Sequence, residues 1–250
     1  MTDSSGYDNL RRLAAQRRSV RRFTSEPVAH ELIEMILDIA RLAPSAGNSQ
    51  PWEFVVVEDA ETRRRIARAA TSLFREARKR DPSFNWSIAV QPYLLRAPVL
   101  IVVLGDRRMM AAYPSILRGN VLLRQSLANC IYGLQLAATS LGLSTAWGTL
   151  QGGRPEEEIR ALLGVPDNFT IDHIVPVGYS DEQEMACAAA LGPARERGPR
   201  RRPLDSVVHW GRYDVTKMRS DEAARDFIWA ESVTRVVPDP DRTSGAAPPV

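Results

Sequence analysis

Residues 98–106 read PVLIVVLGD, and this stretch decides the fold class. An uninterrupted apolar run follows Pro98, and Gly105 and Asp106 end it. A continuous apolar run of this length, unlike an alternating one, is typical of a strand that is buried on both faces. The sequence therefore predicts a central strand with protein packed on either side of it.

Further strands and helices are predicted around this run, from β-branched and aromatic stretches and from apolar residues at helical spacing. The predicted helices cover residues 7–16, 29–42, 59–68, 114–141 and 155–163, and the predicted strands cover residues 52–57, 98–104, 144–148 and 169–177. These elements fit an α+β or a mixed α/β pattern, and we expect a mixed sheet of four to five strands surrounded by helices. The long helix at residues 114–141 is expected either in the core or at a dimer interface.

The composition indicates a folded protein with a mild positive charge. The 250 residues are 44% hydrophobic and carry a formal net charge of +3. No apolar run approaches the ~20 residues of a membrane span, and residues 1–9 lack the apolar stretch of a secretory signal. We therefore expect a cytoplasmic protein with no membrane partner. The positive charge is too small and too dispersed to indicate a nucleic-acid partner.

The cysteines and histidines do not predict a metal site. Cys130 and Cys187 are far apart in sequence, and no histidine lies at ligand spacing from either of them. Because Cys130 lies within an apolar helical pattern, we expect a buried and unreactive thiol.

Two segments on either side of a predicted helix carry the most chemistry. Residues 17–23 read RRSVRRF, and residues 43–52 read APSAGNSQPW. The first offers a hydroxyl and guanidinium groups, which bind phosphate through charge-assisted hydrogen bonds. The second is a turn of small polar residues that leads into a strand. Together they suit a planar cofactor with a phosphate, although a solvated run of charge is the alternative here and for the arginines at residues 200–202.

Five segments, in order along the chain, resemble the FMN-dependent nitroreductase family. They are residues 17–23, 43–57, 140–148 (SLGLSTAWG), 175–179 (VPVGY) and 202–213 (RPLDSVVHWGRY). No single segment is specific, but the matching order extends over residues 10–213. The resemblance implies a homodimer built on the long central helix, with FMN sites at the interface between the subunits.

The resemblance assigns two groups of residues to the phosphate end of FMN. It implies that Arg17, Arg18 and Ser19 bind the phosphate and the ribityl chain. It also implies that Arg201, together with Arg202, closes the phosphate site. No Gly-x-Gly-x-x-Gly or Walker sequence accompanies them, so the nucleotide is held without those motifs.

Other residues are assigned to the flavin ring in the same way. Arg21 would face the N1/C2 edge, where a cation stabilises the reduced flavin. The backbone of Trp147, Gly148 and Thr149 would lie near N5. The partner subunit would line the flavin through the turn before the strand at residues 52–57, with Pro44, Ser45, Ala46, Asn48 and Gln50.

The implied reaction needs no catalytic side chain, because the flavin carries the redox chemistry. NADH or NADPH would reduce it, and a small nitroaromatic, quinone, halogenated or enone-like acceptor would then be reduced in the same place. Two alternatives remain open. One is a dehydrogenase, an oxidase or an oxygen-dependent flavin-consuming enzyme, and the other is a flavin-binding carrier or sensor without turnover.

The domain prediction is one FMN-binding domain over residues 7–213. Residues 1–6 are expected to be disordered, and so is the C-terminal extension, residues 214–250, after about residue 236. Residues 71–96 and 106–120 are the predicted substrate lid. Asn85 and Gln91 are the candidates for the flavin N3/O4 edge.

Several residues near these motifs have simpler interpretations. Trp52 is expected in the core, and Arg22 is expected at the surface or in a salt bridge. For Trp147, one interpretation is that it lines the pocket through its backbone alone. His209 and Trp210 are expected to pack the C-terminal arm.

Overall fold

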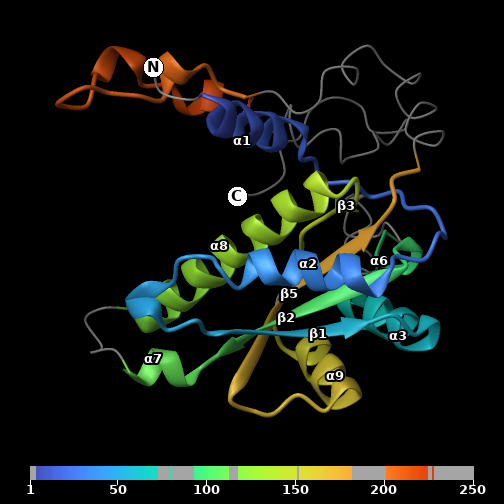
Figure 1. Ribbon diagram of the computed structural model, residues 1–250. Coiled ribbons are helices and arrows are strands. Elements are labelled where there is room, and N and C mark those ends of the chain that lie inside the picture. Colours follow the sequence, from blue (N-terminus) through green and yellow to red (C-terminus); the bar gives the residue numbers. More distant parts are fainter. Residues whose placement is uncertain are drawn as a thin grey trace. The chain divides into compact units, whose positions relative to one another are not determined.

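A five-stranded sheet forms the centre of the computed structural model, which describes residues 4–72, 79, 93–112, 118–150, 152–181, 201–224 and 227. The strands are β1 (Trp52–Val57), β2 (Val99–Asp106), β3 (Ser144–Thr145), β4 (Gly148–Thr149) and β5 (Phe169–Gly178). Their order is β1-β2-β5-β3, with β4 also paired to β5, and these pairings are antiparallel (Figure 1). The predicted α+β fold with four to five strands is confirmed.

The chain divides into two compact units. The first contains the sheet and the described residues up to 72 and from 93 to 181. The second contains residue 79 and the described residues from 201 onward. The single domain expected over residues 7–213 stays a prediction.

Strand β2 is central because both of its faces are apolar. Every residue from Val99 to Gly105 is buried, as predicted from its continuous apolar run. Val103 lies opposite His173, whereas Leu104 lies opposite Ile171. Asp172 is therefore an extra residue in β5, and this β-bulge changes the direction of the strand beside the loop that precedes β5.

Two layers of helices cover the two faces of the sheet (Figure 1). The helices on one face are α2 (His30–Ala40), α7 (Arg108–Ala112) and α8 (Gly119–Ser140). The helices on the other face are α3 (Ala60–Ala70), α6 (Tyr93–Arg96) and α9 (Arg154–Leu163). Helix α1 (Ser5–Gln16) contacts α8 but has no buried residue. Within the described residues, no helix is both long and apolar enough to cross a membrane.

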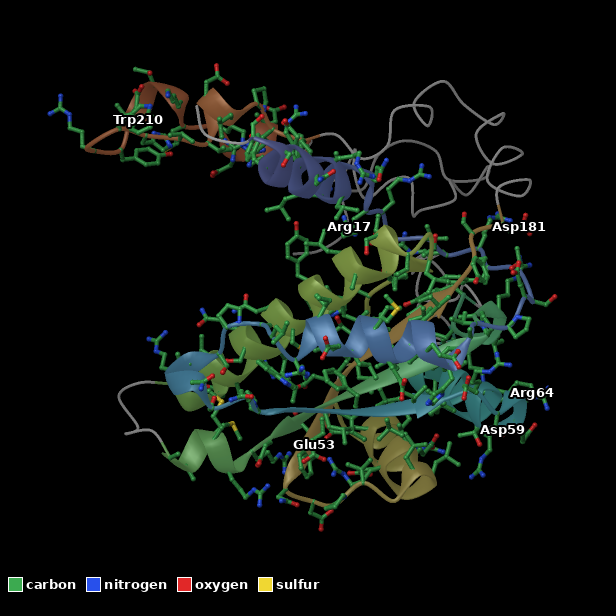
Figure 2. All side chains as sticks on the ribbon, viewed as in Figure 1. Arg17, Glu53, Asp59, Arg64, Asp181 and Trp210 are labelled. Carbon is green, nitrogen blue, oxygen red and sulfur yellow. The ribbon has the colours of Figure 1, made fainter. Side chains whose placement is uncertain are left out.

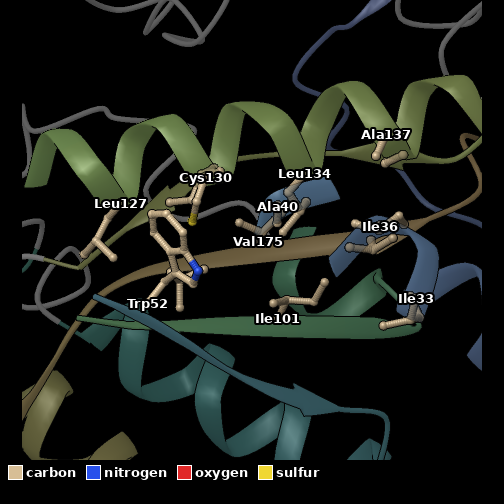
Figure 3. Close-up of a cluster of buried hydrophobic side chains, with 14 of the residues drawn as sticks. Ile33, Ile36, Ala40, Trp52, Ile101, Leu127, Cys130, Leu134, Ala137 and Val175 are labelled. Carbon is tan, nitrogen blue, oxygen red and sulfur yellow. The ribbon is translucent and has the colours of Figure 1, made fainter. Parts of the chain in front are cut away.

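The core under α2 and α8 follows from the apolar face that the sequence predicted for the long helix. Leu127, Cys130 and Leu134 are fully buried against β2 and β5 (Figure 3). Trp52 is 7% exposed in the same core, which confirms its predicted structural role. Burial raises the pKa of the Cys130 thiol to about 12, so this cysteine stays protonated and unreactive at neutral pH.

The ends of the helices are set by local chemistry. Asp59 caps α3, because its Oδ2 accepts a hydrogen bond of 2.7 Å from the Thr62 N–H. Pro155 lies in the first turn of α9, where its missing N–H costs nothing, and Gly164 ends that helix with φ +66°. These caps agree with the predicted start of the helix at residues 59–68 and with both ends of the helix at residues 155–163.

Two predicted elements differ from the structure. Arg118 has φ +49°, a left-handed conformation that cannot continue a helix, so α8 begins at Gly119 and not at residue 114. The single strand predicted for residues 144–148 is two short strands, because Ala146 and Trp147 leave the ladder between β3 and β4. Both differences arise from backbone geometry that composition does not encode.

The described part of the second unit is built from turns. It contains two short 3-10 helices, η3 (Leu204–Ser206) and η4 (Val215–Lys217). The His209 ring stacks on Tyr213 with centroids 4.3 Å apart, and His209 Nδ1 accepts a hydrogen bond from the Asp214 N–H. Trp210 is 89% exposed, so the expectation that it packs this arm is wrong. The residues after 227 lie outside the described part of the chain.

Candidate functional site

The arginine segment at residues 17–23 runs along the edge of the sheet after α1 ends. The Val20 N–H donates to the Thr145 carbonyl at 2.8 Å, and Ser19 forms a parallel bridge with Thr145. Further on, Phe23 bridges Ser180 and is buried. Val20 and Phe23 therefore anchor the segment in the core, and the polar residues between them are held in a defined place.

The polar side chains of this segment remain near the surface. Arg18 and Ser19 are exposed, and Arg17 and Arg21 are half-buried. Arg21 Nη1 donates to the Ser19 carbonyl at 3.2 Å. Figure 2 shows Arg17 where α1 ends, on the same side of the first unit as Asp181. Several guanidinium groups and a hydroxyl within five residues are a donor set suited to a phosphate dianion.

The segment predicted to lie near the flavin N5, Trp147 to Thr149, follows shortly after Thr145, the residue with which the arginine segment pairs. Gly148 lies opposite Ile174, and Thr149 lies opposite His173. The Trp147 Nε1–H donates to His173 Nδ1 at 3.1 Å, and the two rings meet edge to face. The indole is thus used inside the protein, and a role for the Trp147 backbone at a cofactor stays a prediction.

The Trp147 contact also determines the protonation of His173. An indole N–H only donates, so His173 Nδ1 must carry a lone pair and the ring must be neutral. Burial lowers the pKa of His173, and the positive charge of Arg124 acts in the same direction, whereas Asp172 raises it. The neutral ring holds Trp147 in place and so positions the chain that leads into Gly148 and Thr149.

Gly148 occupies a position where only a glycine fits without movement. A Cβ placed on it would lie 3.0 Å from the Ile174 carbonyl oxygen and 3.3 Å from the Tyr93 hydroxyl oxygen. Tyr93 comes from α6 and is half-buried. Burial raises the pKa of Tyr93, and the nearby Arg21 acts in the opposite direction. The Tyr93 hydroxyl thus lies beside Gly148, and Tyr93 is close enough to Arg21 for the positive charge to affect its pKa.

Tyr93 adjoins the Trp147–Thr149 segment, whereas the sequence placed it only within the predicted lid at residues 71–96. Nothing in the residues around it formed a motif, and only the fold brings α6 under β4. Asn85 and Gln91, the candidates for the flavin N3/O4 edge, lie outside the described residues. So does most of the predicted lid at residues 71–96.

The turn at residues 44–50 has an unusual backbone. The turn contains the short 3-10 helix η1 (Ala46–Asn48). Gly47, Asn48 and Gln50 have positive φ values of 54°, 51° and 45°. Left-handed conformations cost energy for residues other than glycine and persist where the surroundings hold them. Here the Ser45 hydroxyl accepts a hydrogen bond from the Gln50 N–H at 3.0 Å.

The same turn is fixed to the first half of α8. The Ala46 N–H donates to Ser126 Oγ at 3.2 Å, and Asn129 Nδ2 donates to the Pro44 carbonyl at 3.1 Å. Gly47 to Gln50 remain exposed. The turn therefore presents a fixed polar surface to a molecule outside the chain.

Within one chain, the turn and the arginine segment lie at opposite ends of the sheet. Thr145, which pairs with Ser19, lies opposite Val177 in β5. Trp52, which follows the turn, lies opposite Gly105 and hence at the level of Thr170. Seven residues of strand correspond to about 23 Å. The structure brings residues 17–21 to residues 145–149, but it does not bring residues 44–50 to them.

A cavity of about 460 Å³ begins at Thr149 and His173. Met110, Asn120 and Arg124 line it from α7 and the start of α8. Met110 and Asn120 belong to the second predicted lid, residues 106–120, whose residues 113–117 lie outside the described chain. The cavity combines apolar surface with hydrogen-bonding and cationic groups, as ligand pockets commonly do.

Arg201 and Arg202 belong to the second unit. Arg201 is exposed, and Arg202 Nη2 donates to the Ser206 carbonyl at 2.7 Å. Among the described residues, no group of three or more His, Cys, Asp or Glu side chains is arranged to hold a metal ion.

Comparison with known proteins shows the family of this chain. Residues 14–179 match the model of the Nitroreductase family. A putative NADH dehydrogenase/NAD(P)H nitroreductase of Archaeoglobus fulgidus is 32% identical over 172 residues, 67% of this chain and 83% of that protein. An iodotyrosine deiodinase of Thermotoga neapolitana is 31% identical over 68% of this chain and 88% of that protein.

The fold is shared with solved structures as well. The NADPH:FMN oxidoreductase of Vibrio harveyi, solved in complex with NAD+, superposes with a TM-score of 0.63 and 19% identity, over 90% of this chain and 86% of that one. The family match covers the sheet, the helices packed on it, the arginine segment at residues 17–23 and the segment at residues 145–149 with which it pairs. The chain belongs to the nitroreductase family.

Proposed function

We propose that the protein is an FMN-dependent oxidoreductase that uses NADH or NADPH to reduce a small aromatic or conjugated acceptor. The observation that carries this proposal is the pairing of Ser19 and Val20 with Thr145, which joins a phosphate-binding donor set to the Trp147–Thr149 segment. FMN would take hydride from the nicotinamide and pass the electrons to the acceptor.

The residues present fit such a cofactor. Arg17, Arg18 and Ser19 would hold its phosphate and ribityl chain. They place two guanidinium groups and a hydroxyl side by side along the chain, and Arg18 and Ser19 are exposed, so a dianion can reach them. Arg21 would supply positive charge at the edge of the ring, and Tyr93 beside it would supply a hydroxyl. Because Gly148 has no side chain, the Ile174 carbonyl and the Tyr93 hydroxyl can both lie close to its backbone, where a larger side chain would collide with them.

A second copy of the chain would complete the site. Because residues 44–50 lie about 23 Å along the sheet from the arginine segment of their own chain, one FMN is better served by the turn of a partner. Pro44, Ser45, Ala46 and Asn48 would line the flavin from that partner, with Gln50 holding the turn through its bond to Ser45.

Exposed apolar surface supports this homodimer. Met35 and Ile39 lie on α2 and Leu42 lies in the turn just after it, and these residues are 51%, 45% and 63% exposed. Helix α1 is amphipathic in sequence and yet has no buried residue. The small residues of α8 do not add to this argument, because Ala137 and Ala138 are buried within the chain and Gly133 faces Ile39 and Ala40.

The cavity at Thr149 and His173 is our candidate for part of the acceptor pocket. It adjoins the segment expected at the reactive part of the cofactor. Met110 gives it an adaptable apolar side, and Arg124 gives it a cation that favours acceptors with a nitro, quinone or phenolate oxygen.

The first test is the visible spectrum of the protein mixed with FMN, followed by anaerobic titration with NADH and with NADPH. Flavin bands that co-purify or are retained, and that bleach with one nucleotide, are expected. Arg17→Ala with Arg18→Ala should weaken FMN binding by about 3–6 kcal/mol, from two lost charge-assisted contacts. The matched control is Arg64→Ala with Arg65→Ala, which removes two exposed arginines from α3.

Two results would contradict the proposal at different levels. If the Arg17/Arg18 variant binds FMN as tightly as the control, the phosphate assignment is wrong. If the wild-type protein retains no flavin, or retains flavin that neither nucleotide bleaches, then the NAD(P)H-dependent reaction is wrong.

Reductive dehalogenation is a second candidate reaction, favoured by the 31% identity to an iodotyrosine deiodinase. In that case the reductant would supply two electrons and a proton equivalent, a carbon–halogen bond would be replaced by carbon–hydrogen, and halide would leave. Halide release from a halogenated phenol, measured against one NAD(P)H consumed, tests this candidate. Consumption of a nitroaromatic without halide release from the phenol would leave the first reaction.

A further inference from the structure

A second cationic cavity lies entirely within the C-terminal unit. It measures about 390 Å³, and Arg201, Arg202, Lys217 and Arg219 all line it. Ser206 and Phe227 also contribute to its wall. Lys217 and Arg219 lie well beyond residue 179, where the family match ends. They therefore belong to the part of the chain for which the family similarity gives no role.

Two of these cations, Arg202 and Lys217, are hydrogen-bonded to backbone carbonyls of the same unit. Arg202 Nη2 donates to the Ser206 carbonyl at 2.7 Å, and Lys217 Nζ donates to the Val208 carbonyl at 3.0 Å. Each bond uses one donor and leaves others of the same side chain available. The side chains are therefore preorganised, which lowers the entropy cost of binding a ligand.

Arg219 supplies the observation that points to a ligand. Its Nη1 is buried and has no hydrogen-bond partner within the described chain. A buried, unpaired guanidinium nitrogen is costly, and such groups are usually satisfied by a partner or an ion. The guanidinium also lies over the Phe227 ring, with Cζ 5.4 Å from the centroid, which fixes its plane.

The charge balance of the cavity supports an anion. No carboxylate is among the described residues that line it. The nearby Asp214 feels the charge of Lys217, but its Oδ1 already accepts from the Thr216 N–H at 3.0 Å and from the Thr216 hydroxyl at 2.6 Å. Four cations around one small space repel each other unless an anion lies between them.

We propose that this cavity binds the phosphate group of a nucleotide, with Lys217 and Arg219 joining Arg201 and Arg202. The proposal extends the phosphate role that the family resemblance implies for Arg201 and Arg202, and its choice of nucleotides rests on the proposed function. Guanidinium groups match phosphate oxygens, and the Phe227 ring offers an apolar wall to the rest of the nucleotide. Two sources share this chemistry: the 5′-phosphate of FMN and the 2′-phosphate of NADPH.

The first experiment titrates the full chain with inorganic pyrophosphate by calorimetry. Arg219→Gln should weaken binding by about tenfold or more, as expected for a lost charge-assisted contact. Arg201→Gln, at an exposed position where folding is not at risk, should weaken it in the same direction. Arg212→Gln is the control, because it removes the same charge from an exposed position outside the cavity.

Two further measurements identify the source of the phosphate. A loss of FMN affinity in Arg219→Gln, with riboflavin affinity unchanged, assigns the cavity to the cofactor. A KM for NADPH that rises about tenfold, with the KM for NADH unchanged, assigns it to the reductant.

Three outcomes overturn the proposal. The first is that pyrophosphate does not bind the wild-type protein, and the second is that it binds both cavity variants as tightly as it binds Arg212→Gln. The third is weakened pyrophosphate binding with neither nucleotide measurement affected. Because pyrophosphate binding needs no flavin, this test remains decisive even if the protein proves not to bind FMN.

Discussion

Gly148 lies in a part of the candidate site that is packed too closely for a side chain. Gly148→Ala would place a methyl group 3.0 Å from the Ile174 carbonyl oxygen, which belongs to the β5 backbone and cannot move freely. We expect the free energy of unfolding to fall by about 1–3 kcal/mol, the usual cost of overpacking. Urea denaturation of the two proteins measures it.

Gly133→Ala is the matched control for this substitution. Its Cβ would meet the Ile39 carbonyl oxygen at 3.6 Å, an ordinary contact, and alanine is favoured over glycine inside a helix. The control should be neutral or more stable by about 0.5–1 kcal/mol. Equal destabilisation by both substitutions would show that the close approach at Gly148 is not the cause.

His173 should make stability depend on pH. Burial lowers its pKa in the folded protein, so the unfolded chain binds a proton more readily below the ordinary value of about 6.5. Stability is then fully present above about pH 6.5 and falls as the pH decreases, by at most about 1.4 kcal/mol per pH unit for one proton. Urea unfolding between about pH 5 and pH 8 measures this slope.

His173→Gln should flatten this slope, because glutamine still accepts a hydrogen bond from Trp147 but does not titrate. His30→Gln is the control, since the His30 side chain is 69% exposed on α2. A slope that persists in His173→Gln and disappears in His30→Gln would assign the pH dependence to the wrong histidine.

At the scale of single elements, α9 contains two ion pairs with the same spacing and very different surroundings. Glu156 and Arg160 are each 16% exposed, and Arg160 also donates to the Phe169 carbonyl of β5. Arg154 and Glu158 are 73% and 43% exposed, and Arg154 Nε donates to Glu158 Oε1 at 2.8 Å. The first pair ties the helix to the sheet, whereas the second lies in water.

Arg160→Leu should therefore destabilise the protein by about 2–4 kcal/mol, because it leaves Glu156 and two backbone carbonyls without their partner. Arg154→Leu should change stability by less than about 0.5 kcal/mol. Thermal or chemical unfolding of the two variants tests this difference. Equal effects would mean that burial does not govern the strength of these pairs.

Helices and strands were largely predictable from the sequence. The apolar period of α2 and of most of α8, the cap at Asp59 and the continuous run of β2 are local signals, because they depend on neighbouring residues. The start of α8 and the break between β3 and β4 were not predictable. They follow from the conformation of Arg118 and from Ala146 and Trp147 leaving the ladder, which depend on what the fold places around them.

At the scale of the whole molecule, we expect that dimerisation and cofactor binding are coupled. Ile39→Glu would place a charge within the exposed apolar row of α2. It should convert the dimer to a monomer in analytical ultracentrifugation and weaken FMN binding by about tenfold or more, because the partner's turn would be lost. Ala161→Glu, on the exposed side of α9, adds the same charge and should change neither property.

A monomeric variant that binds FMN with wild-type affinity would contradict the shared site. A variant that stays dimeric would show that the row of α2 is not the contact surface. The two outcomes separate the position of the interface from its role in cofactor binding.

The sequence by itself determined the pieces: the apolar strand of β2, the helical periods, the donor set at residues 17–21 and the polar turn at residues 44–50. Each depends on residues close together in the chain, so composition and spacing reveal it. Only the tertiary structure decided that Ser19 pairs with Thr145, that the Tyr93 hydroxyl lies beside Gly148, and that the turn lies at the other end of the sheet. These relations follow from strand order and packing, which join residues far apart in sequence and leave no local pattern.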